Sequence, residues 1–298
     1  MSEGVGHVAG GTEFADFEGA KEYARNRHGP DGSQLLDPYF LPALAELADE
    51  SDTIDIGAGA APWAIAAAKA GANSVFAFDL SYQMTAQAAE AVSELDTDRP
   101  QLAIASAMDI PTRDDAFGLA LSINVGCNLP SHDESVYPVL RHFQEIHRVL
   151  RPGGYAIFTT PSSLNDVFTK YAAESDARDL AVAIDNVEDE EQMRKVLNGY
   201  PDVLRATVAE TTDGWKIAEP DDKLTSGQPI WRRIPGMVVP NYYHTEEEYM
   251  RVMEAADLTI VDQHRPLLEP HQYEDAENVL GSQYTRTNAF GIYVLQKI

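Results

Sequence analysis

The sequence of 298 residues contains a single cysteine, Cys127, so it cannot form an internal disulfide or supply a cysteine-based metal cluster. It has no apolar run approaching the roughly 20 residues that span a bilayer. Its first residues carry neither the basic nor the apolar stretch of a secretory signal. These absences favour a cytoplasmic protein.

Basic residues are scarce as well. Lysine and arginine number 22 against 48 aspartates and glutamates, which gives a net charge of −26. Because such a surface repels phosphate backbones and anionic lipids, we expect neither nucleic acid nor membrane as a partner. A carboxylate-rich surface also stays hydrated in high salt, which screens its self-repulsion. The acidity is therefore explained either by a halophilic source or by an ordinary acidic protein.

Apolar runs alternate with helical patterns over much of the chain, which predicts βαβ units and a largely parallel sheet covered on both faces. The expected strands are 53–56, 74–78, 102–105, 117–123, 155–160, 258–263 and 290–296. The expected helices are 14–27, 35–48, 62–70, 82–95, 136–150 and 245–256.

The pattern changes after residue 162. An acidic helical stretch (166–200) is followed by a hairpin pattern centred on Asp213-Gly214 and by a segment rich in prolines and other breakers, 220–240. We therefore predict an N-terminal helical cap (1–48), a core domain (49–161 with 241–298) and a lid or substrate insertion (162–240).

The segment Asp55-Ile-Gly-Ala-Gly59 follows the first strand. Gly57 and Gly59 allow a tight turn and a close approach of the backbone to a ligand. A third glycine, as in dinucleotide sites, is replaced by Ala61 or Pro62. A carboxylate at position 55 would repel a pyrophosphate and suits a cationic group instead.

Polar residues follow the next strands. Asp79 ends the second strand and can accept hydrogen bonds from ribose hydroxyls, or cap the next helix. Met84 can lie against adenine or pack within its helix. Asp109 can accept from the exocyclic amine of adenine, or be a surface residue. Asn124 ends the fourth strand, where it can meet the transferred group or be a polar terminus.

Four segments together resemble class I S-adenosylmethionine (SAM)-dependent methyltransferases. They are Asp55-Ile-Gly-Ala-Gly59, Phe78-Asp-Leu-Ser81 with Met84, Ala107-Met-Asp109, and Glu145-Ile-His-Arg-Val-Leu-Arg-Pro-Gly-Gly154. The resemblance covers about 50–161 and 240–298. It implies a Rossmann-like α/β fold, whose seven-stranded and mostly parallel sheet has an antiparallel last strand, and SAM as cofactor.

The resemblance also implies site roles. Asp55 and the loop 57–59 would lie near the cationic methionine part of SAM, Asp79 would hold the ribose, and Met84, Met108 and Asp109 would frame adenine. The implied cofactor residues are Asp55, Gly57, Ala58, Gly59, Asp79, Leu80, Met84, Ala107, Met108, Asp109, Ile123 and Asn124.

Methyl transfer from a sulfonium needs mainly alignment, with a general base only for a nucleophile that holds its proton. The candidate catalytic residues are His132 and His244, with Tyr243 orienting the substrate; surface or capping roles are the alternative. His142 and His147, on the helix before the Pro-Gly-Gly turn, are expected to be remote. No Asn-Pro-Pro-Tyr signature follows the fourth strand, which argues against adenine-N6 or glutamine-amide substrates.

We therefore expect a metal-independent methyltransferase for a small molecule, with a homodimer as a possible assembly. No His-Glu-x-x-His motif or cysteine pair points to a metal. One alternative is an inactive module that binds SAM or S-adenosylhomocysteine. A less favoured alternative is an NAD-dependent oxidoreductase, against which Asp55 and the missing third glycine argue.

Overall fold

A computed structural model describes residues 33–96, 99–130, 137–161, 170–171, 174–200, 203–218, 224–234, 237–264 and 290–298. The predicted helix 14–27 and the candidate His132 lie outside these residues. Within them, no helix combines the length and the apolarity that crossing a bilayer requires.

The larger of two sheets has seven strands in the order β11-β12-β5-β4-β1-β2-β3. β12 pairs antiparallel with β5 and β11, whereas the other pairs are parallel. The predicted Rossmann-like sheet with an antiparallel last strand is confirmed. The strands are β1 (Asp52–Ile56), β2 (Ser74–Asp79), β3 (Gln101–Ile104), β4 (Phe117–Ile123), β5 (Leu150–Pro161), β11 (Leu258–His264) and β12 (Phe290–Lys297).

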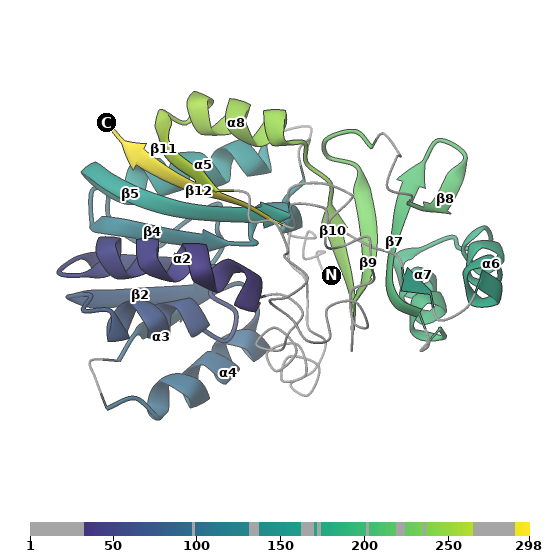
Figure 1. Cartoon of the computed structure of the whole chain (residues 1–298), viewed down its shortest axis with the longest axis horizontal. Helices are drawn as coiled ribbons and strands as arrows, with labels where there is room; N and C mark the ends of the chain where they lie inside the picture. The colour runs from purple at the N-terminus through teal and green to yellow at the C-terminus, as the bar shows by residue number, and fades with distance from the viewer. Residues whose placement is uncertain are drawn as a thin grey trace, which may run out of the picture.

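Helices cover both faces of this sheet (Figure 1). Leu119 and Leu121 pack with α2, α3 and α4, whereas Ala120 between them packs with α5 and α8. Because successive strand residues face opposite sides, burial on both faces explains the continuous apolar runs of the sequence. The helices are α2 (Ser33–Ala48), α3 (Pro62–Lys69), α4 (Tyr82–Ser93), α5 (Pro138–Val149) and α8 (Glu246–Ala255).

A second, five-stranded sheet lies beside the first (Figure 1). Its main strands follow the order β10-β9-β7-β6, and β8 pairs with β7. It is built from β6 (Lys170–Tyr171), β7 (Val203–Thr211), β8 (Gly214–Ile217), β9 (Pro229–Ile234) and β10 (Met237–Tyr242), with α6 (Glu174–Ile184) and α7 (Glu190–Asn198). Its own core is Leu180, Ile184, Met193, Leu197, Val208, Trp231 and Val238.

Only part of this second sheet was predicted from the sequence. The predicted hairpin is present, but its turn lies one residue earlier than predicted, at Thr212-Asp213, since Thr211 pairs with Gly214, whose φ is +113°. The breaker-rich segment 220–240, by contrast, contains β9 and β10, which we did not predict. Pro229 begins β9, and Pro240 lies in β10, which pairs only with β9 in this sheet. Proline is tolerated at strand starts and edges, so it did not exclude strands here.

Candidate cofactor and active site

The glycine loop after β1 contains three left-handed residues. Gly57 has a φ of +65°, Gly59 of +58° and Ala61 of +61°. A Cβ on Gly57 would lie 2.7 Å from Cγ2 of Val125, whereas a Cβ on Gly59 would meet no atom of the described residues within 4 Å. Gly57 is therefore required by packing and by its backbone, and Gly59 faces open space that a ligand can enter. Ala61, at the N-cap of α3, takes the left-handed conformation that glycine favours.

Asp55 is buried beneath this loop, with 1% of its surface exposed. Its Oδ2 accepts a hydrogen bond from the Ala64 amide at 3.0 Å, in the first turn of α3. The carboxylate thus satisfies one of the unpaired amides at the start of that helix and lies at its positive end. The role of Asp55 near the methionine part of SAM stays a prediction.

Asp79 ties the first two loops together. Its Oδ2 accepts from the Gly59 amide at 2.9 Å and its Oδ1 accepts from the Ser81 amide at 2.8 Å. Of the apolar candidates after β2, Leu80 is 39% exposed, whereas Met84 is 2% exposed.

The loop after β3 presents Asp109. Ala107 and Met108 pack partly against the core, and Asp109 itself is exposed. The Asp109 amide donates to the Ser106 carbonyl at 3.2 Å, and the Met108 amide donates to the Ser106 hydroxyl at 3.2 Å. The loop is therefore a tight turn with the exposed carboxylate at its tip.

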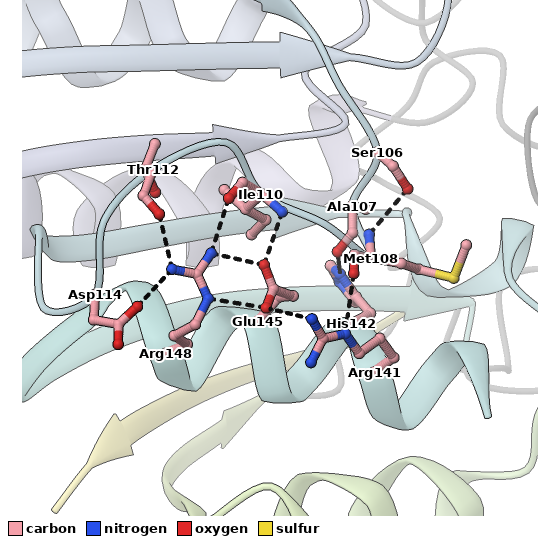
Figure 2. A network of polar contacts seen from close by, with 10 residues as sticks. All are labelled: Ser106, Ala107, Met108, Ile110, Thr112, Asp114, Arg141, His142, Glu145 and Arg148. Carbon is pink, nitrogen blue, oxygen red and sulfur yellow. Dashed lines mark hydrogen bonds and ion pairs between the residues drawn. The ribbon is translucent and has the colours of Figure 1, made fainter. Parts of the chain in front are cut away.

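Side chains of α5 hold this loop from below, as Figure 2 shows. Glu145 accepts from the Ile110 amide at 2.8 Å. Arg148 donates to the carbonyls of Ile110 and Thr112, each at 2.8 Å, and pairs with Glu145 at 2.7 Å. Burial alone would raise the pKa of Glu145, but hydrogen bonds from Arg148 and the Ile110 amide outweigh it and lower that pKa. Glu145 is thus held ionised although only 1% of it is exposed.

His142 joins the same network. Its Nδ1 lies 3.1 Å from the Ala107 carbonyl oxygen and its Nε2 lies 2.8 Å from Oγ of Ser122. A carbonyl only accepts, so Nδ1 carries the hydrogen and the Ser122 hydroxyl donates to Nε2 of the neutral ring. Burial lowers the pKa of His142 to about 4, against the opposing hydrogen bond to Ala107 and the charge of Glu145. We expected this residue to be remote, but it contacts a residue of the predicted cofactor loop.

The end of β4 connects the core to the second sheet. Asn124, with a φ of +57°, donates from its amide to the Thr159 carbonyl at 3.0 Å. Its own carbonyl accepts from Nδ2 of Asn128 at 3.1 Å, and Oδ1 of Asn128 accepts from Nδ2 of Asn241 in β10 at 2.7 Å. Ile123 before it is buried. A chain of amides therefore links β10 to the end of β4.

The described catalytic candidates follow β10. His244 is 4% exposed, and its Nε2 donates to the Leu129 carbonyl at 2.6 Å. Its ring packs edge-on against Tyr249 with centroids 5.1 Å apart. Tyr243 is half-buried, and its amide donates to the Gln228 carbonyl at 2.9 Å. His244 thus joins the two sheets, and its catalytic role stays a prediction.

The structure therefore brings the predicted cofactor residues to one edge of the large sheet, where β1, β2, β3 and β4 end. Sequence reasoning missed the α5 side chains beneath them. Their signal was present, since an arginine, a glutamate and a second arginine at spacings of four and three share one helix face. Among the described residues, no cluster of histidine, cysteine, aspartate or glutamate could hold a metal ion.

Comparisons with known proteins agree with this geometry. Residues 54–158 match the family described as "Methyltransferase domain". An S-adenosylmethionine-dependent methyltransferase from Mesorhizobium loti has a similar structure, with a TM-score of 0.57, 19% identity, and coverage of 90% of this chain and 100% of its own.

Two further solved structures share the fold. A protein from Listeria monocytogenes assigned to the same class gives a TM-score of 0.55 at 17% identity and covers 88% of this chain and 96% of its own. A Haloferax volcanii protein bound to the methyltransferase activator Trm112 gives 0.54 at 15% identity, with 94% of each chain covered. No curated protein sequence matches the chain.

Residues 54–158 thus form a methyltransferase domain within a class I fold. The chain shares the fold of S-adenosylmethionine-dependent methyltransferases, and S-adenosylmethionine is the cofactor that this fold and the methyltransferase domain imply. The local structure fits that group, because open space borders Gly59 and a carboxylate, Asp79, stands beside it.

Proposed function

We propose that the protein transfers the methyl group of SAM to a small molecule, mainly by aligning the two. The observation that supports this most is Asp79, whose carboxylate contacts the amide of Gly59 next to open space. A carboxylate in that position accepts from ribose hydroxyls, and the left-handed loop lets the nucleoside approach the backbone.

The cofactor residues have separate tasks in this proposal. When bound, SAM supplies an electrophilic methyl group on its sulfonium. Asp79 holds the ribose hydroxyls, Leu80 and Met108 flank adenine, and Asp109 accepts from the adenine amine. Asp55 lowers the electrostatic energy of the cationic methionine part from beneath the loop. These assignments follow from the position of each group at the carboxyl edge of the sheet.

The acceptor would bind between this edge and the second sheet. In support, the Asn241–Asn128–Asn124 chain and the His244–Leu129 hydrogen bond join β10 and the residues after it to the end of β4. We propose residues 162–240 as the lid, with Tyr243 orienting the acceptor. The net charge of −26 supports a small molecule over a nucleic acid.

Calorimetric titration tests the cofactor assignment. S-adenosylhomocysteine should bind the wild-type protein, and NAD at the same concentrations should give no heat of binding. Binding of NAD alone would overturn the proposal. Methyl transfer from SAM labelled in its methyl group to a panel of small nucleophiles then separates an active enzyme from a module that only binds.

The acidity supports a second, independent proposal, namely that the protein works in high salt in the cytoplasm. Screening of 48 carboxylates against 22 basic groups should raise its unfolding temperature steeply with potassium chloride. A flat salt dependence would favour the ordinary acidic protein. Sedimentation of the protein alone in the same buffers tests for the homodimer. Sedimentation of its mixture with an activator such as the one bound to the Haloferax volcanii protein tests for a complex.

A further inference from the structure

Asp109 is exposed at the tip of its loop, and its backbone sets the position and direction of the Cα–Cβ bond from which the carboxylate extends. A peptide group is planar, so the carbonyl of one residue and the amide of the next move together. The group before Asp109 contains the Met108 carbonyl and the Asp109 amide. The group after it contains the Asp109 carbonyl and the Ile110 amide. Fixing both groups therefore fixes φ and ψ of Asp109.

Side chains of α5 hold one atom of each group (Figure 2). Nε of Arg141 donates to the Met108 carbonyl at 3.2 Å, and the Asp109 amide of the same group donates to Ser106. Glu145 accepts from the Ile110 amide at 2.8 Å. Arg141 and Glu145 also pair with each other at 3.1 Å, so the two contacts form one unit.

Arg148 and His142 complete the support on either side. Arg148 binds the carbonyls of Ile110 and Thr112 after Asp109, and His142 binds the carbonyl of Ala107 before it. Four side chains of a single helix thus bind the backbone of residues 107–112. Such spacing on one rigid helix can hold a loop within the tolerance that a directional hydrogen bond demands.

We propose that Arg141 and Glu145 are positioning residues for adenine recognition, which set the direction of the Asp109 carboxylate without touching the cofactor. The proposal rests on the proposed role of Asp109 as acceptor for the adenine amine. It gives the helix segment before the Arg-Pro-Gly-Gly turn a task in choosing the base, in addition to its packing against the sheet.

The test compares S-adenosylhomocysteine with S-inosylhomocysteine, which carries an oxygen where adenine carries its amine. Wild-type protein should bind the inosine compound about 10- to 100-fold more weakly, as expected when a hydrogen bond to a charged acceptor is lost. In Arg141→Met the two affinities should converge to within about threefold, because a misdirected carboxylate no longer distinguishes them.

Arg151→Met is the matched control. Arg151 has a similarly exposed side chain (45% against 43%), and it likewise binds one carboxylate, Asp52, and one carbonyl, Ala116. It lies at the opposite edge of the sheet, so its loss should leave the discrimination ratio unchanged. Arg148→Lys, which keeps the charge but cannot span two carbonyls, should lower the ratio partly.

The outcomes distinguish a failure of the proposed function from a failure of the positioning role alone. If wild-type protein fails to bind S-adenosylhomocysteine, the proposed function is wrong. If it binds both compounds equally, Asp109 does not read the amine, and this inference is overturned with it. If wild-type protein discriminates and Arg141→Met does so equally well, α5 serves only stability, and the positioning role alone is refuted.

Discussion

The two edges of the seven-stranded sheet are built on different principles. At the amino edge, charged groups join different strands and the turns between them: Asp52 binds Arg151 and Ser74, and Lys297 binds Asp115 at 2.7 Å and the Leu150 carbonyl at 2.8 Å. At the carboxyl edge, carboxylates bind backbone amides instead, as Asp79 does with Gly59 and Ser81.

Non-glycine residues with a left-handed backbone occur at both edges, and the residue types differ between the two edges. Glu50, Asp115 and Asp257 precede strands at the amino edge, whereas Ala61 and Asn124 follow strands at the carboxyl edge. At the amino edge, an acidic side chain adopts the left-handed conformation in an exposed turn, where it can also form an ion pair. The left-handed residues at the carboxyl edge are held by packing and by backbone contacts. The amino edge therefore fixes strands to one another, and the carboxyl edge fixes loops in shapes that serve a ligand.

Replacing the edge carboxylates should give the largest contrast. Asp79→Asn loses the charge that accepts from the ribose, so we expect affinity for S-adenosylhomocysteine to fall by about 100-fold. Asp52→Asn should leave that affinity unchanged and lower the free energy of unfolding by about 1 kcal/mol or less, since its ion pair is partly exposed. Titration calorimetry and urea unfolding measure the two quantities. Equal cofactor affinity in both variants would refute the ribose assignment.

Two histidines of α5, one near each edge, should make the stability of the protein depend on pH to different extents. The pKa of buried His142 is lowered to about 4, so the unfolded chain binds a proton that the folded chain rejects. Its contribution to stability is present above pH 6.5 and is lost as the pH falls towards 4, up to about 3 kcal/mol. Burial also lowers the pKa of half-buried His147, near Lys297 at the amino edge.

Urea unfolding between pH 7 and pH 4.5 measures this loss. His142→Gln should flatten the pH dependence of the unfolding free energy, and His147→Gln should flatten it less, because its ring is less buried. Protonation of Glu145, whose pKa is also lowered, adds to the loss only below about pH 4.5. If both variants kept the wild-type slope of unfolding free energy against pH, the protonation of His142 would not be the cause of the acid sensitivity.

Two glycines separate backbone strain from ligand contact. Gly59 and Gly153 both have positive φ, +58° and +79°, and within the part of the chain that the structure describes a Cβ on either meets no atom within 4 Å. Alanine at each should cost about 1 kcal/mol of stability for the left-handed backbone. Only Gly59→Ala places a methyl group where the cofactor approaches, so it alone should weaken S-adenosylhomocysteine binding, by about tenfold or more. Weakening by Gly153→Ala to the same extent would show that strain, and no ligand contact, is the cause.

Sequence patterns predicted the loops at the carboxyl edge better than the α5 side chains that hold them. Continuous apolar strands and a glycine turn carry a local signal, so the order of loops and the positions of Asp79 and Asp109 followed from the chain. The α5 network did not, because Arg141 and Glu145 bind backbone atoms more than thirty residues away, and a backbone carbonyl has no sequence signature. β9 and β10 were missed for a related reason, since the pairing of β9 with β7 and of β10 with β9 outweighs the local effect of Pro229 and Pro240.

The smallest predicted effect concerns Ala61, the left-handed residue at the N-cap of α3. Ala61 and Glu50 are both left-handed, at +61° and +54°. Ala61 is fully buried in the α2–α3 core, whereas Glu50 is exposed. The packed methyl of Ala61 contributes about 0.8 kcal/mol, which offsets most of a strain of about 1 kcal/mol.

Glycine at the two positions should therefore act differently. Glu50→Gly relieves strain without losing packing, and should raise the unfolding temperature by a degree or two after the entropic cost of glycine. Ala61→Gly relieves the same strain but loses the buried methyl, so the unfolding temperature should stay level or fall slightly. Thermal unfolding of both variants beside wild type measures this. A clear rise in the unfolding temperature of Ala61→Gly would mean that packing of the methyl group does not offset the backbone strain at the start of α3. The strain would then have to be explained by the shape of the cofactor loop.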